Sequence, residues 1–193
     1  MSKSTIILIA VLGIFGLYGC STYNGLATQN QEVEAAWSKV QTQYQRRLDL
    51  IPNLVNTVKG AANFEKETLT GVIEARSKAT SIQLKAEDLT PENMAKFQEA
   101  QSQLSGALSR LMAVAENYPQ LKATQNFSEL QAQLEGTENR IAVERNNFND
   151  VVKSFNQKVV TFPTNLLAGM FGFSKRGFFE ADAAAQKTPT VQF

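Results

Sequence analysis

The sequence predicts an all-α protein: an antiparallel, up-and-down four-helix bundle with an N-terminal membrane anchor. Three observations lead to this fold class. Glycine and proline are sparse between residues 26 and 162, where alanine, glutamine, asparagine and leucine dominate, and this composition favours helices. Apolar residues recur there at three- and four-residue spacing, the period of a helix with one buried face. The helical segments run to roughly 25–35 residues and are joined by short connections, as in a bundle.

Residues 1–19 read as a signal peptide or an N-terminal anchor. A helix of about 14 apolar residues spans about 21 Å, short of the ~30 Å hydrocarbon core, so the length favours a signal peptide. Leu17-Tyr18-Gly19-Cys20 is similar to the lipobox of bacterial lipoproteins, although Tyr18 is bulkier than the usual residue. We therefore expect lipidation of Cys20 and exposure outside the cytoplasm, on the periplasmic face. The alternative is a retained single-pass span.

A short polar lead, residues 20–29, contains the loop-forming run Tyr23-Asn24-Gly25. The bundle is expected over residues 30–163. Pro52 lacks an N–H group and disfavours helical angles in the residue before it. We therefore expect a tight turn between two helices at residues 49–53, with a kink in one long helix as the alternative. The first helix carries an apolar stripe of Trp37, Val40, Tyr44, Leu48 and Ile51.

The second helix is expected to reach about Thr80, and residues 81–89 form a polar connection. Thr90 has the character of an N-cap, with Pro91 at the first helical position. The third helix, which residues 117–119 end, carries an apolar heptad repeat of Phe97, Leu104 and Leu111.

The last helix is expected to start near Phe127, with Ser128 as its cap, and to stop at Pro163. A heptad repeat keeps one stripe facing a partner helix. The C-terminal tail, residues 164–193, begins with many apolar residues, so we expect it to fold back on the bundle or to touch the membrane. Residues 183–193 are expected to be disordered. The seam of the last helix consists of Leu134, Ile141, Phe148, Phe155 and Phe162.

The chain contains no histidine, and Cys20 is its only cysteine. These absences exclude His/Cys zinc sites, Cys/His nucleophiles and Ser/His/Asp triads. With 19 basic and 18 acidic side chains, the chain has no electrostatic footprint for nucleic acid. We expect no enzymatic activity, no cofactor, no metal, no nucleic acid and no small-molecule substrate; a site built from carboxylates alone is the minor alternative.

Charged residues within the apolar stretches define the candidate site. Because a buried charge costs free energy unless it is paired, we hypothesise a polar cluster that links Arg46 or Arg47 to Glu138 or Glu144. Such a cluster would fix the register of the helices; alternatively, it borders a recognition cleft near Pro52. The full candidate set is Arg46, Arg47, Asp49, Pro52, Asn53, Glu138, Asn139, Glu144 and Arg145.

Several segments of the chain match a known pattern. They are Tyr23-Asn24, Ala36-Trp37, residues 44–55, residues 57–60, Ala75-Arg76, residues 116–123, residues 137–142, Arg145 and Phe148-Asn149. In these segments the chain resembles the LemA family of bacterial membrane-anchored helical proteins. The resemblance implies an N-terminal anchor, an antiparallel helical bundle and a bacterial origin, but no catalytic residues, because the biochemical role of the family is unsettled. Gly19-Cys20 departs from members that keep a long uncleaved span.

The expected function is that of a non-enzymatic, membrane-tethered helical scaffold of the bacterial cell envelope that binds protein partners. The alternative is a membrane-remodelling protein, whose tail and lipid anchor act directly on the bilayer.

Overall fold

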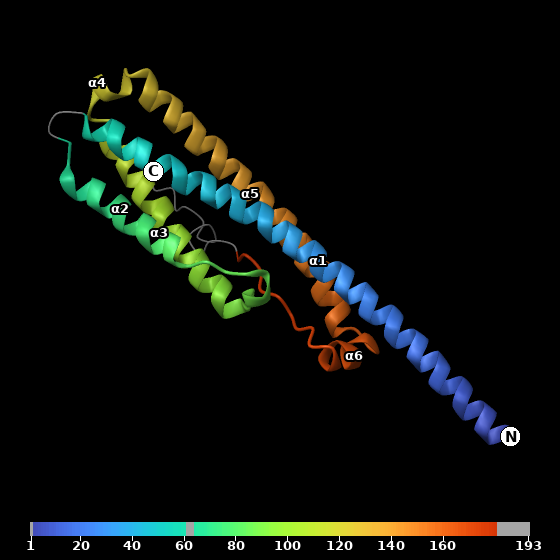
Figure 1. Cartoon of the computed structure of the whole chain (residues 1–193). Coiled ribbons are helices and arrows are strands. Elements are labelled where there is room, and N and C mark those ends of the chain that lie inside the picture. The colour runs from blue at the N-terminus through green and yellow to red at the C-terminus, as the bar shows by residue number, and fades with distance from the viewer. Residues whose placement is uncertain (1, 61–63, 181–193) are drawn as a thin grey trace, which may run out of the picture.

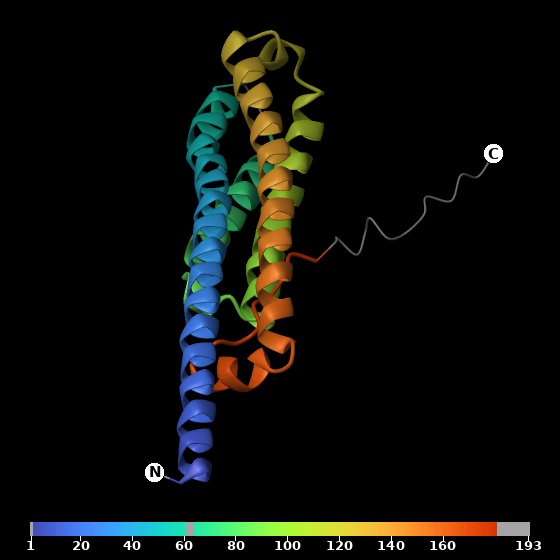
Figure 2. The ribbon, with the colours of Figure 1, turned by 90° about the vertical axis from the view of Figure 1, so that its right-hand side faces the viewer.

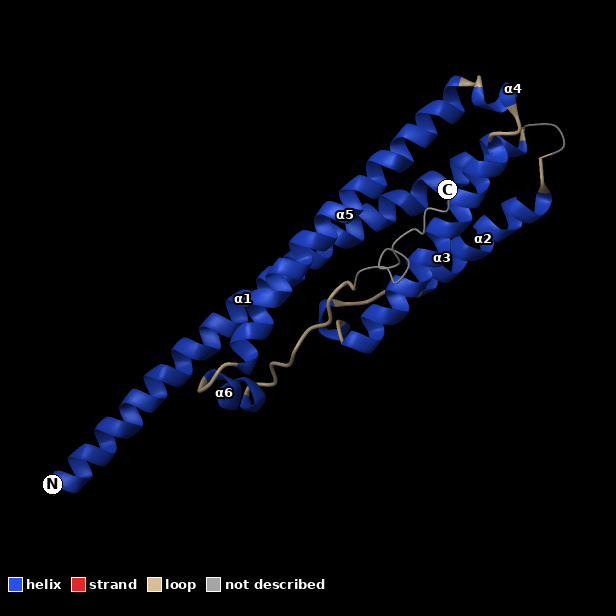
Figure 3. Cartoon of the chain, turned by 180° about the vertical axis from the view of Figure 1, so that it is seen from behind, coloured by secondary structure: helices blue, strands red, loops and turns tan. Residues whose placement is uncertain are grey.

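The computed structural model describes residues 2–60 and 64–180, and all regular structure in these two ranges is helical (Figures 1 and 3). Residues 183–193, expected to be disordered, lie outside the described ranges. The elements are α1 (Lys3–Lys59), α2 (Lys66–Ser81), the short 3₁₀ helix η1 (Ala86–Asp88), α3 (Pro91–Ala115), α4 (Pro119–Lys122), α5 (Gln125–Val160) and α6 (Thr164–Met170).

Two pairs of helices build the body of the molecule. α1 packs along α5, and α2 packs along α3, with a smaller contact between α1 and α2. The chain direction reverses within each pair, and the N-terminal part of α1 projects beyond all other elements (Figures 1 and 2). The short helix α6 lies at that same end of the body, against α1 and α5.

The tight turn expected at residues 49–53 is wrong, because α1 continues through Pro52 to Lys59. A proline inside a helix leaves the carbonyl four residues earlier without its usual N–H donor. Here Arg76 of α2 supplies the replacement: its Nε donates to the Leu48 carbonyl at 3.1 Å. The Pro52 ring lies on the exposed side of α1. A side chain from another helix thus offsets the local effect of the proline.

The polar lead expected over residues 20–29 is also helical and belongs to α1. Its helical form has packing partners, since the side chain of Leu26 is buried. The ring of Tyr23 meets Phe171 edge-on at 5.1 Å between centroids and lies 5.9 Å from Phe173. Contacts with the C-terminal part of the chain therefore outweigh the loop-forming character of the sequence here.

The remaining boundaries follow the sequence more closely. Thr90 caps α3 by accepting a hydrogen bond from the Asn93 amide at 3.3 Å, and Pro91 is the first helical residue. The predicted cap at Ser128 is wrong, because α5 begins three residues earlier and Thr124 occupies the N-cap position. Ser128 instead donates its own amide to the Thr124 carbonyl within the first turn.

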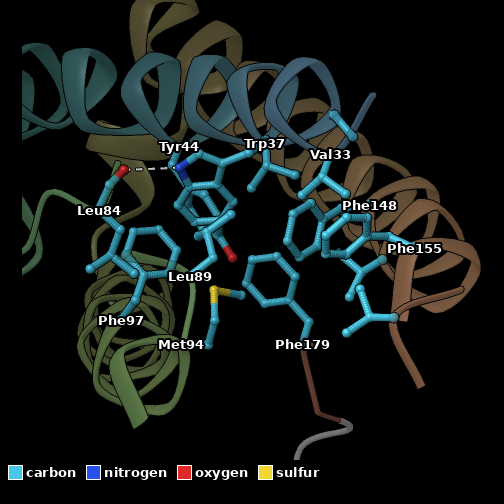
Figure 4. Close-up of a cluster of buried hydrophobic side chains, with 14 of the residues drawn as sticks. Val33, Trp37, Tyr44, Leu84, Leu89, Met94, Phe97, Phe148, Phe155 and Phe179 are labelled. Carbon is cyan, nitrogen blue, oxygen red and sulfur yellow. Dashed lines mark hydrogen bonds between the residues drawn. The ribbon is translucent and has the colours of Figure 1, made fainter. Parts of the chain in front are cut away.

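The core has two parts that follow each other along the long axis. The part far from the projecting end of α1 collects aliphatic side chains from α1, α2, α3 and α5, among them Leu54, Leu69, Leu104 and Leu134. The near part is aromatic and centres on Trp37, Phe97, Phe148 and Phe179 (Figure 4). The Trp37 ring donates to the Leu84 carbonyl at 2.9 Å, so its one polar atom is satisfied in the core.

The seam of α5 is buried at Leu134, Ile141, Phe148 and Phe155. Its fifth member, Phe162, is 75% exposed because the helix ends at Val160. After α6, residues 173–180 run back along the body as a drawn-out chain without regular structure (Figure 1). We call these residues the strap. The strap places Phe179 in the aromatic core.

Candidate functional site

Arg47 is the most deeply buried charge of the described residues. It lies on the inner face of α1, and its side chain is 1% exposed. A guanidinium in this position needs several acceptors to offset the loss of hydration. Its partners come from two other helices, which identifies Arg47 as the centre of the candidate site.

The Arg47 guanidinium reaches α5 and α3 together. Nη1 donates to Glu138 Oε1 at 2.6 Å and to Ser105 Oγ at 2.8 Å. Nη2 donates to the side-chain carbonyl of Gln101, which is itself buried. The guanidinium carbon also lies 5.1 Å from the centre of the Tyr44 ring, within the range of a cation–π contact. We call Arg47, Gln101, Ser105 and Glu138 the arginine cluster.

The two charges of the arginine cluster have different surroundings. The Glu138 side chain remains 44% exposed, whereas Arg47 is sealed inside. The carboxylate can therefore keep part of its hydration, and the guanidinium depends on its protein partners. A substitution that leaves Arg47 buried without its partner should therefore cost more folding free energy than one that leaves Glu138 without its partner.

The other candidates on α1 face outward. Arg46, Asp49, Pro52 and Asn53 are all exposed. Asp49 accepts a hydrogen bond from the side chain of Gln45 at 2.7 Å, within the same helix. The structure thus separates two neighbouring arginines: Arg47 points into the body, and Arg46 points away from it.

The other candidates on α5 also lie apart from the cluster. Asn139 is exposed. Glu144 accepts from Asn147, one turn along the helix. Arg145 donates to the Glu180 carbonyl at 3.1 Å, and its guanidinium carbon lies 4.8 Å from the centre of the Phe179 ring. Its contacts are therefore with the strap.

Open grooves flank the arginine cluster on two sides. One groove, of about 650 Å³, lies between α1 and the connection that follows α2, and its lining includes Arg46, Asp49 and Gln101. A second groove, of about 660 Å³ between α3 and α5, is bordered by Ser105 and Glu138. Among the described residues, no group of three or more His, Cys, Asp or Glu side chains is arranged to hold a metal ion.

Sequence reasoning missed three residues that complete this region. Gln101 sits between Phe97 and Leu104 in the apolar seam of α3, and a polar residue in such a seam is the available signal. Ser105 follows the seam without a distinctive pattern. Arg76 could not be found from spacing alone, because its target is a backbone carbonyl on another helix.

One helix in the described part of the chain, α1, is long and apolar enough to cross a membrane. The apolar window lies near the N-terminus and is not buried inside the body. Ile6, Leu8, Leu12 and Phe15 are all more than half exposed. A large apolar surface of this kind fits membrane association.

Comparison with known proteins agrees with this picture. The chain is 28% identical to Protein LemA of Metamycoplasma hominis over 173 residues, which cover 90% of this chain and 75% of that protein. It is 26% identical to Magnetosome protein MamQ 2 of Paramagnetospirillum magneticum over 186 residues, which cover 88% and 68% of the two chains. It is 24% identical to Magnetosome protein MamQ of Magnetospirillum gryphiswaldense over 213 residues, covering 99% and 78%.

The model of the LemA family matches residues 36–193, most of the chain. The match includes every member of the arginine cluster and the whole strap. The names of the relatives carry no enzymatic function. With its helical architecture and apolar N-terminal helix, the chain belongs to the LemA family.

Proposed function

We propose that this chain is a membrane-tethered, non-enzymatic helical scaffold of the bacterial cell envelope, which binds protein partners through its exposed surface. In this proposal α1, α2, α3 and α5 form an antiparallel up-and-down bundle. The observation that supports it best is α1 itself: a single helix carries exposed apolar residues at its N-terminal end and core residues at the other. The same helix thus leads from the membrane-facing end of the chain into the body.

The arginine cluster supports a structural role over a chemical one. A catalytic group must reach a substrate, whereas every partner of Arg47 given above is a neighbouring side chain. Three helices meet at this guanidinium, so its bonds oppose sliding of α1 against α3 and α5. Buried polar groups set helix register in the same way in coiled coils.

The surface for a partner is the groove that Arg46 and Asp49 border. Both charges are exposed. A photo-crosslinking residue at position 46 is expected to give discrete protein adducts in intact cells, and the Asp49→Arg change is expected to reduce them. The matched control is Glu74, an exposed α2 residue outside this groove. Equal adducts at positions 46 and 74, or none at either, would contradict the proposed surface.

We further propose that Cys20 is acylated and that the mature chain faces the periplasm. Cys20 is exposed on α1, so its thiol is accessible to an acyl transferase. The intact mass of the membrane-extracted protein is expected to show cleavage before Cys20 and added acyl chains. An unprocessed N-terminus would instead assign the apolar segment to a retained span.

A second candidate function, direct membrane remodelling, rests on a different observation. The short helix α6 packs against α1. On or next to it lie three apolar side chains that are each more than half exposed: Phe162, Leu166 and Met170. Exposed apolar side chains beside an anchor are suited to insertion at a bilayer interface. The full-length chain reconstituted in liposomes distinguishes the two functions. A scaffold leaves vesicle shape unchanged, whereas a remodeller deforms vesicles and loses this effect when the three residues are changed to serine.

A further inference from the structure

Side chains of α3 and α5 hold the strap by hydrogen bonds to its backbone. Asn149 of α5 donates to the Phe179 carbonyl and accepts from the Phe179 amide, both at 2.9 Å. Asn156 makes the same pair of bonds with Arg176, both at 2.8 Å. Gln98 of α3 does so with Glu180, at 2.7 and 3.1 Å. Each amide side chain thus pairs with one residue of the strap as a neighbouring β-strand would.

The distance between two of these amide side chains along α5 equals the distance between the strap residues that they bind. Asn149 and Asn156 lie seven residues apart on α5, a rise of about 10.5 Å. The strap residues they hold, Phe179 and Arg176, lie three residues apart, and three extended residues cover about 10 Å. The strap runs antiparallel to α5 in this register. The face of α5 is therefore complementary to an extended peptide, whatever its side chains.

Side-chain selection happens at the inward positions of the strap. Phe179 is 5% exposed and packs between Phe148, Trp37 and Phe97 (Figure 4). Its neighbour Phe178 is 41% exposed. Buried and exposed residues alternate from Gly177 to Glu180, and the aromatic pocket accepts Phe179 but not Phe178.

Two further positions are selected by shape and by polar contacts. A Cβ atom at Gly177 would lie 2.9 Å from the backbone Cα of Pro91, so only glycine fits. The Gly177 amide donates to the Leu89 carbonyl at 2.8 Å. The Arg176 guanidinium donates to the Glu87 carbonyl at 3.1 Å and to Asn30 Oδ1 at 3.0 Å. The site thus selects the pattern Arg-Gly-X-Phe in an extended chain.

We propose that the groove between α1, α3 and α5 is a peptide-binding site for this pattern, and that its partner is the strap of a second copy of the chain. In the structure the chain's own strap fills the site. Every copy carries the pattern, and tethering to one membrane raises the local concentration of copies. Gly172, with φ of 78°, ends α6 in a left-handed C-cap just before the strap, and the Phe173 amide donates to the Ala168 carbonyl at 2.9 Å, so the strap leaves the helix as a separate segment. This inference rests on the proposed function, binding of protein partners, and names one partner.

The first test uses full-length chain in detergent and a fluorescent peptide of residues 173–180. Gly177→Val is expected to expel the tethered strap without substituting any residue of the groove, so this variant should bind the peptide at least tenfold more tightly than the unchanged chain. A peptide with valine at the glycine position should not bind. A peptide with alanine in place of Phe178 should bind as well as the original, because that side chain points outward.

The groove side has its own control. Adding Asn149→Ala to the Gly177→Val chain is expected to weaken peptide binding at least tenfold. If Gly177→Val is folded, as judged by circular dichroism and Trp37 fluorescence, and binds no peptide, the peptide site is refuted. If it is unfolded, Phe179→Ala serves as the second variant, and the peptide should raise its melting temperature; absence of any shift also refutes the site.

The second test addresses the partner. A tagged Gly177→Val chain is co-reconstituted in vesicles with an untagged Asn149→Ala chain, which keeps a normal strap. These two copies should co-purify, whereas two Gly177→Val copies should not. Peptide binding without co-purification would overturn the second copy as the partner. Crosslinking at position 46 probes another surface, so a failure there is distinguishable from a failure here.

Discussion

The arginine cluster predicts an unequal response to two ways of removing its ion pair. Glu138→Gln leaves the Arg47 guanidinium buried without a counter-charge. The double change Arg47→Met and Gln101→Leu removes the buried charge and its buried amide partner together, and leaves Glu138 able to face water. Because the cost of a broken pair is the charge that stays buried, the single substitution should be the more harmful.

The magnitude follows from the geometry. Two unit charges about 4 Å apart interact by about 4 kcal/mol at the effective dielectric constant of a protein surface. The Glu138 side chain is 44% exposed, so solvent screening reduces the loss to roughly half, about 2 kcal/mol. For a chain of this size that corresponds to a drop in melting temperature of about 4–8 °C. The double variant is expected to lie within about 1 kcal/mol of the unchanged chain, or above it.

Thermal unfolding of the detergent-solubilised full chain, followed by circular dichroism and by Trp37 fluorescence, measures both effects. Glu92→Gln is the matched control. Its carboxylate accepts a hydrogen bond from Lys96, whose bond and charge lower the pKa of Glu92, but both side chains are more than half exposed. The drop in melting temperature is expected to be much smaller there than for Glu138→Gln. A double variant that loses as much stability as Glu138→Gln would refute the asymmetry.

Three further substitutions test the fold, each by the same unfolding measurement. Arg76→Ala should cost about 1–3 kcal/mol by leaving a carbonyl of α1 unsatisfied, and the cost should largely vanish in a Pro52→Ala background, where the restored N–H bonds that carbonyl. Phe155→Ala should cost about 3–5 kcal/mol, whereas Phe162→Ala, in the same heptad repeat but exposed, should change stability by less than about 0.5 kcal/mol. Thr90→Ala should cost about 1 kcal/mol as a lost cap, and Thr90→Ser should restore it.

Periodicity predicted which faces of the helices are buried. Four of the five seam residues of α5 are in the core, and the exception is the one beyond the helix end at Val160. The period of a pattern identifies a face, but it does not locate the residue at which the helix stops. The same limit explains the misplaced cap at Ser128, because Thr124 also has the side chain of a capping residue.

The error at Pro52 has a different origin. The rules for proline are local, and they describe a helix that has no neighbours. The donor that makes Pro52 acceptable is Arg76, on a helix that follows later in the chain. Such a compensation depends on how α1 and α2 pack, and no spacing in the sequence encodes it.

The sequence limited the centre of the candidate site to Arg46 or Arg47 and to acidic residues of the last helix. It could not decide which arginine points into the body. That depends on the rotation of α1 about its axis, and the apolar stripe does not define this rotation closely enough to separate two adjacent residues. The sequence predicted that the apolar tail folds back on the bundle or touches the membrane, but it could not predict which residues bind the strap. Asn149 and Asn156 are visible as polar residues seven apart, but their partner is a backbone, which has no sequence signature.

The uninterrupted course of α1 has a mechanical consequence. From Cys20 to its end at Lys59, the helix is about 60 Å long and has no hinge. Because the helix is continuous, its end at Lys59 stays at a fixed distance from Cys20, whereas a flexible linker of the same length would let that distance vary. A change of about 20° in the direction of the helix at Cys20 would shift its far end sideways by about 20 Å. Small changes of angle at the anchored end therefore become large displacements at the end where other proteins would meet the chain.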